Sequence, residues 1–274
     1  MKTLRLGLIG GNIKESRSPA LQIACGLSAG RNVTYDLLIP DELGLSFEAT
    51  LRRCAAAGFD GVNVTYPYKE EVLKYVKAAE PVVAALGASN TIKFSKSGAH
   101  AYNTDNTGFA AAYRAKWGGV SPGRVLLIGT GGVGRAIAFA LADLGAAEIL
   151  LHDTDREKAD ALRQAISDYS RVSVILADSL QDPSGLDGLI NATPLGMTGR
   201  EGSPLRKDFA GHPRWAFDAV YTPEYTIFRA QMEALGAEFL SGYELYFYQG
   251  IQAFRIFSGV DPDADWVRTT LRGP

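Results

Sequence analysis

The amino-acid sequence predicts an α/β protein with two domains of unequal length. Apolar runs alternate with helix-like patterns along most of the chain, which is the element order of sheets built mainly from parallel strands. The 274 residues exceed the usual size of a single domain. Hydrophobic residues make up 46% of the chain and charged residues 21%, as in ordinary soluble globular proteins.

The first βαβαβ series is expected between Leu4 and about Gly87, and a hairpin follows around Ser-Lys-Ser-Gly. A second alternating series begins at Val125, so the boundary should fall between 103 and 123, where a helix opens over 109–116. The amphipathic helix over 245–257 is expected to return to the first domain. The expected strands are 6–9, 33–39, 61–65, 91–94, 98–102, 125–128, 148–151, 172–176, 188–191, 215–218 and 238–240, with early helices at 20–29 and 43–57.

A glycine-rich turn lies between the strand at 125–128 and a helix-like run that starts at Ile137. Its first glycine permits a tight turn, the next glycines let the backbone approach a pyrophosphate, and Gly134 lets helix and strand pack closely. Asp153 ends the next strand, nineteen residues after Gly134, which is near the spacing of a ribose-binding acid. We therefore predict a Rossmann-type dinucleotide-binding domain over 106–240 and a substrate domain over 1–105 and 241–274. A merely structural glycine turn is the alternative.

Charge and cysteine content exclude several other classes of protein. The net charge of −2 and the pI near 6.0 give no electrostatic reason to expect nucleic acid or an anionic membrane as partner. Cys25 and Cys54 with three histidines form no metal-ligand spacing and no disulfide framework, so we expect no metal and a cytoplasmic location. The sequence contains no run of about 18 apolar residues that would span a bilayer.

Polar residues follow the first and third predicted strands. The hydroxyls of Ser16 and Ser18 could donate to one carboxylate, although Ser18 before Pro19 is also a common helix cap. Pro67 should end the third strand and leave Thr65 and Lys69 at its carboxyl end. Lys69 is either a solvated residue or a proton donor and acceptor for a carbonyl and alcohol pair.

Three later segments contribute further candidates. Asp105 is either part of a turn and helix cap or the carboxylate partner of Lys69. Thr193 and Met197 follow another buried strand and either face the nicotinamide end of a cofactor or form a plain loop. Gln249, on an otherwise apolar helix, is either a satisfied core amide or a contact to a polyol.

Taken in order, these motifs resemble those of the shikimate/quinate dehydrogenase family over nearly the full chain. The matching blocks are Ser-x-Ser-Pro at 16–19, Asn-Val-Thr-x-Pro-x-Lys at 63–69, Gly-Ala-x-Asn-Thr-Ile at 87–92, Asn-Thr-Asp-x-x-Gly-Phe at 103–109 and Asn-Ala-Thr-Pro-x-Gly-Met at 191–197.

The resemblance implies an oxidoreductase that transfers hydride between a nicotinamide cofactor and a ring hydroxyl. It implies that Lys69 and Asp105 form the catalytic pair, with Lys69 moving the hydroxyl proton. Ser16 and Ser18 would hold the substrate carboxylate, with Tyr221 near it. Ring hydroxyls would be bound by Thr65, Asn90, Asp105 and Gln249, and the cofactor by Gly129, Gly131, Gly132, Val133, Gly134, Asp153, Thr193 and Met197.

Departures from the family pattern bear on cofactor and substrate. Members that use NADP carry Asn-Arg-Thr where this chain has His152-Asp153-Thr154, and an aspartate repels a 2′-phosphate by roughly 2 to 6 kcal/mol. We therefore predict NAD, with NADP left open by Arg156 and Lys158.

The resemblance implies that threonine at position 18 favours quinate and that Ser18 is the residue of shikimate-preferring members, so we expect shikimate first and quinate second as the substrate. Glu15 and Gln22 replace usual family residues and keep an aminoshikimate substrate open. A catalytically idle metabolite sensor is a further alternative. The sequence does not decide between a monomer and a homodimer, or between a biosynthetic and a catabolic role.

Overall fold

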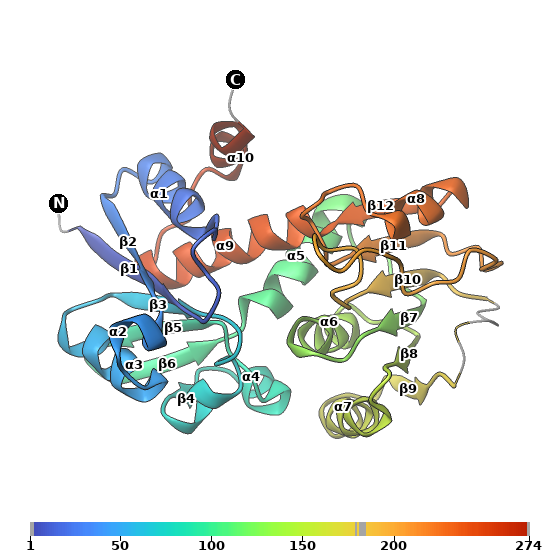
Figure 1. The fold of residues 1–274 in the computed structure, drawn as a ribbon, viewed down its shortest axis with the longest axis horizontal. Coiled ribbons are helices and arrows are strands. Elements are labelled where there is room, and N and C mark those ends of the chain that lie inside the picture. The colour runs from blue at the N-terminus through green and yellow to red at the C-terminus, as the bar shows by residue number, and fades with distance from the viewer. Residues whose placement is uncertain (1–2, 179, 181–184, 273–274) are drawn as a thin grey trace. The chain divides into compact units, whose positions relative to one another are not determined.

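The computed structural model describes residues 3–178, 180 and 185–272. These residues form two compact units (Figure 1). Unit 1 comprises the described residues up to Thr104 and those from Phe247 onward, and unit 2 comprises Asp105–Tyr246. The predicted limits, 105 and 241, lie one residue after and six residues before these bounds. The larger difference arises because one continuous helix, α9 (Gly242–Ser258), contributes to both units.

Unit 1 contains a mixed six-stranded sheet in the order β2-β1-β3-β5-β6-β4. Strands β1, β2 and β3 are parallel, whereas β5 and β6 form the predicted antiparallel hairpin. The carboxyl ends of β1 and β3 therefore lie at the same edge of the sheet. The strands are β1 (Leu4–Ile9), β2 (Val33–Leu38), β3 (Gly61–Val64), β4 (Lys77–Ala78), β5 (Thr91–Ser95) and β6 (Gly98–Tyr102).

Helices cover both faces of this sheet. Phe47 and Leu51 of α3 pack in one core cluster with Val62 of β3, while Phe257 of α9 packs with Leu6 of β1 in another. The helix α10 lies against α1. The elements are α1 (Ser18–Ser28), α2 (Pro40–Leu43), α3 (Phe47–Ala56), a 3-10 helix (Glu71–Lys74), α4 (Pro81–Leu86), α9 and α10 (Ala264–Arg272).

The helix expected over 43–57 is present as α3, which begins at Phe47, because the chain is interrupted at 44–46 after the short helix α2. Gly44 adopts a left-handed conformation with φ of 63° and ends α2. The Ser46 hydroxyl then accepts the N–H of Ala49 and begins α3.

Unit 2 contains a six-stranded, all-parallel sheet in the order β12-β11-β10-β7-β8-β9. Helices α6 and α7 lie on one face and α8 on the other (Figure 1). Phe228 and Met232 of α8 pack with Leu126 and Ile128 of β7. The elements are α5 (Thr104–Trp117), β7 (Arg124–Ile128), α6 (Gly132–Asp143), β8 (Glu148–His152), α7 (Arg156–Tyr169), β9 (Ser173–Leu176), β10 (Gly188–Asn191), β11 (Trp215–Asp218), α8 (Ile227–Ala234) and β12 (Glu238–Ser241).

The parallel arrangement brings the carboxyl ends of all six strands of unit 2 to one edge, where open α/β sheets bind ligands. Across the residues described, no helix is long and apolar enough to cross a membrane, and no cluster of three or more metal-ligating side chains occurs.

Candidate active site

The glycine turn after β7 is shaped by two close backbone approaches. Gly129 has φ of +96°, a conformation that favours glycine. A Cβ on Gly134 would lie 1.9 Å from the carbonyl oxygen of Gly129, so a side chain at 134 cannot fit without moving the turn. A Cβ on Gly131 would instead meet nothing within 4 Å. The turn therefore has no room for a side chain at Gly134 but has free space at Gly131, where α6 begins without a side-chain cap. An uncapped helix start of this kind suits an anion.

Asp153 is fixed against this turn by Thr130. Its Oδ2 accepts the Thr130 N–H and the Thr130 hydroxyl, each at 2.7 Å, and its Oδ1 accepts the N–H of Asp155 at 2.9 Å. Partial burial opposes ionisation, but these hydrogen bonds together lower the pKa of Asp153. The carboxylate is therefore charged at neutral pH. Thr130 was missed by sequence reasoning because it occupies the position between two glycines for which the glycine motif specifies no residue type.

Both cations that the sequence analysis named for a 2′-phosphate are engaged with carboxylates. Arg156 forms an ion pair with Asp178 at 2.5 Å, and Lys158 lies 3.4 Å from Asp155. Both cations are largely exposed. A phosphate at Asp153 would have to draw one of them away from its partner.

A cavity of about 380 Å³, here called the Tyr221 cavity, lies between the glycine turn and the loops after β10 and β11. It brings together six residues predicted from the sequence: Gly131, Gly132, Val133, Thr193, Met197 and Tyr221. The remaining wall consists of Ala192, Pro194, Ala219, Val220 and Thr222. Ala192 and Pro194 lie in the family block at 191–197, but none of the five was predicted as a site residue, because small or apolar side chains have no distinctive chemistry.

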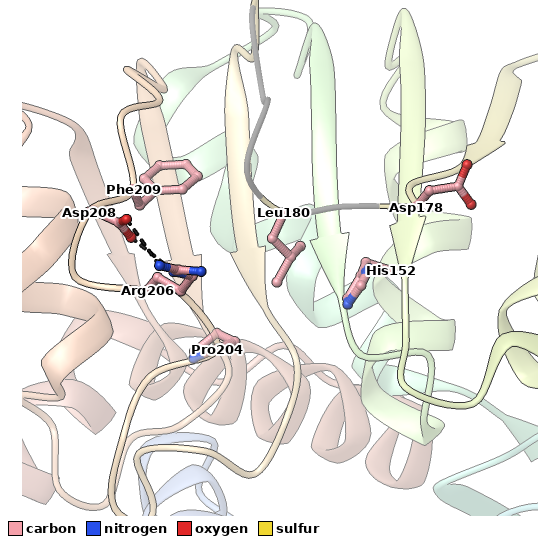
Figure 2. Close-up of a pocket in the computed structure, with 7 residues that line it drawn as sticks. All are labelled: His152, Asp178, Leu180, Pro204, Arg206, Asp208 and Phe209. Atoms are coloured by element: carbon pink, nitrogen blue, oxygen red, sulfur yellow. Dashed lines mark hydrogen bonds and ion pairs between the residues drawn. The ribbon is translucent and has the colours of Figure 1, made fainter.

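A second cavity of about 380 Å³, here called the His152 cavity, lies at the ends of β8 and β9 (Figure 2). Arg206 is paired with Asp208 at its rim, and the Nδ1 atom of His152 lies 3.1 Å from the carbonyl oxygen of Ala177. No sequence pattern indicated this cavity, because separate segments of the chain build it. Its lining residues are His152, Asp178, Leu180, Pro204, Arg206, Asp208 and Phe209.

Ser16 and Ser18 lie at the start of α1 in unit 1. The interpretation of Ser18 as the helix cap is wrong: Ser18 is the first helical residue, and Arg17, at the cap position, does not cap the helix through its side chain. The Ser16 hydroxyl accepts the N–H of Ser18 at 3.2 Å. Both serine side chains are partly exposed and remain suited to a ligand carboxylate.

Asn90 is the centre of a buried polar network. Its Oδ1 accepts the Thr104 N–H at 2.7 Å and the hydroxyls of Thr104 and Thr91 at 3.0 Å each. Its Nδ2 donates to the Oε1 atom of Gln249 at 3.3 Å. The amide oxygen of Asn90 is thus fully engaged, so only its N–H side suits a ligand hydroxyl. The predicted residues Asn90 and Gln249 are in contact, whereas Thr91 and Thr104 were not anticipated.

Thr65 and Lys69 follow β3, as the position of Pro67 predicted. The Thr65 N–H donates to the carbonyl oxygen of Ile9 at 2.9 Å, so the loops after β1 and β3 are adjacent. The backbone carbonyl of Lys69 accepts the Ser89 N–H at 2.8 Å, and the residue is half-buried. Asp105 is buried near the start of α5 and begins unit 2. The pairing of Lys69 with Asp105 stays a prediction.

The parallel sheet, the glycine turn and Asp153 define a Rossmann-type dinucleotide-binding protein. Residues 8–92 match the family described as Shikimate dehydrogenase substrate binding domain. The quinate/shikimate dehydrogenase (NAD(+)) of Corynebacterium efficiens is 35% identical over 98% of this chain and 98% of its own length. The chain therefore belongs to the shikimate/quinate dehydrogenase family, as the sequence motifs predicted.

Solved structures agree over nearly the whole chain. The quinate dehydrogenase of Corynebacterium glutamicum in complex with NAD has a TM-score of 0.91 at 32% identity, covering 99% of both chains. The shikimate 5-dehydrogenase of Thermus thermophilus in complex with NADP(H) and shikimate has a TM-score of 0.84 at 29% identity, covering 98% of this chain and 99% of its own. The two relatives bind different dinucleotides, so membership of the family leaves the cofactor undecided.

Proposed function

We propose that this chain is an NAD-linked dehydrogenase that interconverts shikimate and 3-dehydroshikimate. The observation that carries the proposal is the Tyr221 cavity, where the glycine turn and two strand-end loops of the family pattern meet. Family membership supports the reaction class, because relatives that span the whole chain are named for shikimate or quinate oxidation.

The residues of unit 2 fit a dinucleotide laid along the carboxyl edge of the sheet. The Tyr221 cavity would hold the nicotinamide, and the open side of Gly131 at the start of α6 would hold the pyrophosphate. Asp153 would accept from the adenosine ribose, and the His152 cavity would take the adenine. Strand order supports this sequence of subsites. Strands β10 and β11 lie on one side of β7, whereas β8 and β9 lie on its other side.

NAD is proposed over NADP because Asp153 is both charged and fixed. A carboxylate has about four acceptor positions, and three short hydrogen bonds hold this one in place. It could not swing away from a 2′-phosphate without losing its bonds to Thr130. The neighbouring cations are paired, so they offer the phosphate little compensation.

The bound NAD would supply a hydride acceptor for the ring carbon that bears the reacting hydroxyl. Lys69 takes the proton of that hydroxyl as the carbonyl forms, and returns it in the reverse direction. Asp105 binds the same hydroxyl, and its carboxylate stabilises the positive charge that Lys69 acquires. In unit 1, Ser16 and Ser18 hold the carboxylate, while Thr65, Asn90 and Gln249 bind ring hydroxyls.

Shikimate is proposed ahead of quinate because position 18 is serine, the residue of shikimate-preferring members of the family, whereas threonine at this position accompanies a preference for quinate.

Steady-state assays should compare shikimate, quinate and an aminoshikimate, each with NAD and with NADP. The highest kcat/KM is expected for shikimate with NAD. A higher kcat/KM with NADP would reject the cofactor assignment, and turnover of none of the three compounds would reject the enzyme in favour of a metabolite sensor.

A further inference from the structure

A buried polar pair joins the ends of β10 and β11 beside the Tyr221 cavity. Asn191 and Asp218 are the last residues of their strands, lie opposite each other in the parallel register, and are 0% and 1% exposed. The Nδ2 atom of Asn191 donates to the Oδ1 atom of Asp218 at 2.9 Å. A charged side chain is rarely buried to this extent unless its oxygens are fully hydrogen-bonded.

Asn191 fixes the first wall of the cavity. Its Oδ1 accepts the N–H of Thr193 at 3.0 Å and the Thr193 hydroxyl at 2.7 Å. Its Nδ2 also donates to the carbonyl oxygen of Leu195 at 3.1 Å. The loop that carries Thr193 therefore wraps around this one amide, and the amide is in turn oriented by Asp218.

Asp218 fixes the second wall. Its Oδ1 accepts the Val220 N–H at 3.0 Å, and its Oδ2 accepts the Thr226 hydroxyl at 2.6 Å. The Thr226 hydroxyl also accepts the N–H of Arg229 and so begins α8. The segment 219–222, which lines the cavity, is thus held between Asp218 and Thr226.

Among the described residues, three groups donate to Asp218: the Asn191 amide from β10, the Val220 N–H and the Thr226 hydroxyl at the start of α8. Ser241 lies opposite Asp218 on β12, and none of these groups is charged. Desolvation raises the pKa of Asp218 to about 6, although the three donors favour the carboxylate. Protonation would place an O–H against groups that are themselves donating, so at least one of the hydrogen bonds would be lost.

We propose that Asp218 is a positioning residue for the dinucleotide, and that its ionised form holds both walls of the Tyr221 cavity in the binding geometry. This inference rests on the proposed function, because it assigns the nicotinamide to that cavity. Asp218 acts through Asn191 and Thr226 and needs no contact with the reacting atoms.

The test measures the Kd of NADH by fluorescence titration of the full-length enzyme between pH 5 and 8, with kcat and the KM for shikimate. For the wild type, Kd should rise about tenfold between pH 7 and pH 5, as expected for one group that must be ionised. Asp218→Asn should raise Kd at least tenfold at pH 7 and abolish most of the pH dependence. The KM for shikimate should rise less than the Kd of NADH, since Tyr221 is the only proposed shikimate contact that lies on the walls held by Asp218.

Asp187→Asn is the matched control, because Asp187 precedes β10 at the opposite end of the strand and accepts the N–H of Arg124. It should retain the wild-type Kd and pH profile.

If Asp218→Asn does not fold, Thr226→Val is the second variant. It removes one donor to Asp218 and should shift the midpoint of the wild-type pH profile to higher pH. Wild-type affinity and slope in Asp218→Asn, or an unmoved midpoint in Thr226→Val, would overturn the inference. A wild-type enzyme that binds neither NADH nor NADPH would instead reject the proposed function, and the inference with it.

Discussion

The loops after β1 and β7 occupy equivalent places in their sheets but use different chemistry. Each strand is the first of its unit and lies between the second strand and a later one. The connection after β7 contains only Gly129–Gly131 before α6, whereas the connection after β1 spans Gly10–Arg17 before α1. A short glycine turn exposes backbone N–H groups, which suit a phosphate of any nucleotide. A longer loop presents the hydroxyls of Ser16 and Ser18, whose spacing can select one small carboxylate. The comparison suggests that unit 1 contributes side-chain chemistry and unit 2 contributes backbone geometry.

The largest expected effect tests side-chain chemistry in unit 1. Lys69→Ala should lower kcat on the order of 100-fold or more with little change in the KM for shikimate, because general acid and base catalysis contributes about that much. Lys74→Ala, at an exposed position in the following 3-10 helix, should leave both constants unchanged. Unaltered turnover in Lys69→Ala would end the assignment.

Substitutions of Gly134 and Gly131 should affect different properties of unit 2, the first its stability and the second its affinity for NADH. Gly134→Ala should destabilise the protein by roughly 3 kcal/mol, because its Cβ would lie 1.9 Å from a backbone oxygen. Gly131→Ala should leave the melting temperature nearly unchanged, since its Cβ meets nothing, but should weaken NADH binding about tenfold by crowding the pyrophosphate. Thermal unfolding and fluorescence titration give the two readouts. Equal melting temperatures for the two variants would contradict the packing role of Gly134.

Asp153 and Thr130 test whether a fixed charge sets cofactor choice. Asp153→Ala should raise kcat/KM for NADP about 30-fold, which corresponds to the lower limit of about 2 kcal/mol for the repulsion. Thr130→Val removes only the hydroxyl bond to Asp153 and should shift the preference in the same direction but by less. A wild-type ratio of NAD to NADP activity in Asp153→Ala would disprove the argument from charge.

The smallest effect concerns the polar network of unit 1. Asn90→Ala and Gln249→Ala should each raise the KM for shikimate. In a double-mutant cycle, the free energies of unfolding should show a coupling of about 1 kcal/mol, as for a typical hydrogen bond between contacting residues. Strict additivity would indicate that the 3.3 Å contact contributes nothing to the fold.

Local patterns in the sequence predicted most of the strands and the turn chemistry. Alternation of apolar runs located β7, β10 and β11, and the glycine spacing with Asp153 indicated a dinucleotide site, because these features depend on neighbours in the chain. The same reasoning placed the start of the helix at 43–57 four residues too early, because it did not detect the break at Gly44–Ser46 that separates α2 from α3.

The amino-acid sequence by itself determined the family, the α/β class and the residues at the ends of the strands. Only the tertiary structure decided how those residues are held. Strand register sets Asn191 opposite Asp218, the turn brings Thr130 onto Asp153, and separate segments enclose the His152 cavity. The reason is physical: propensity and periodicity act over a few residues, whereas these contacts join positions 23 or more residues apart whose meeting depends on packing of the whole sheet.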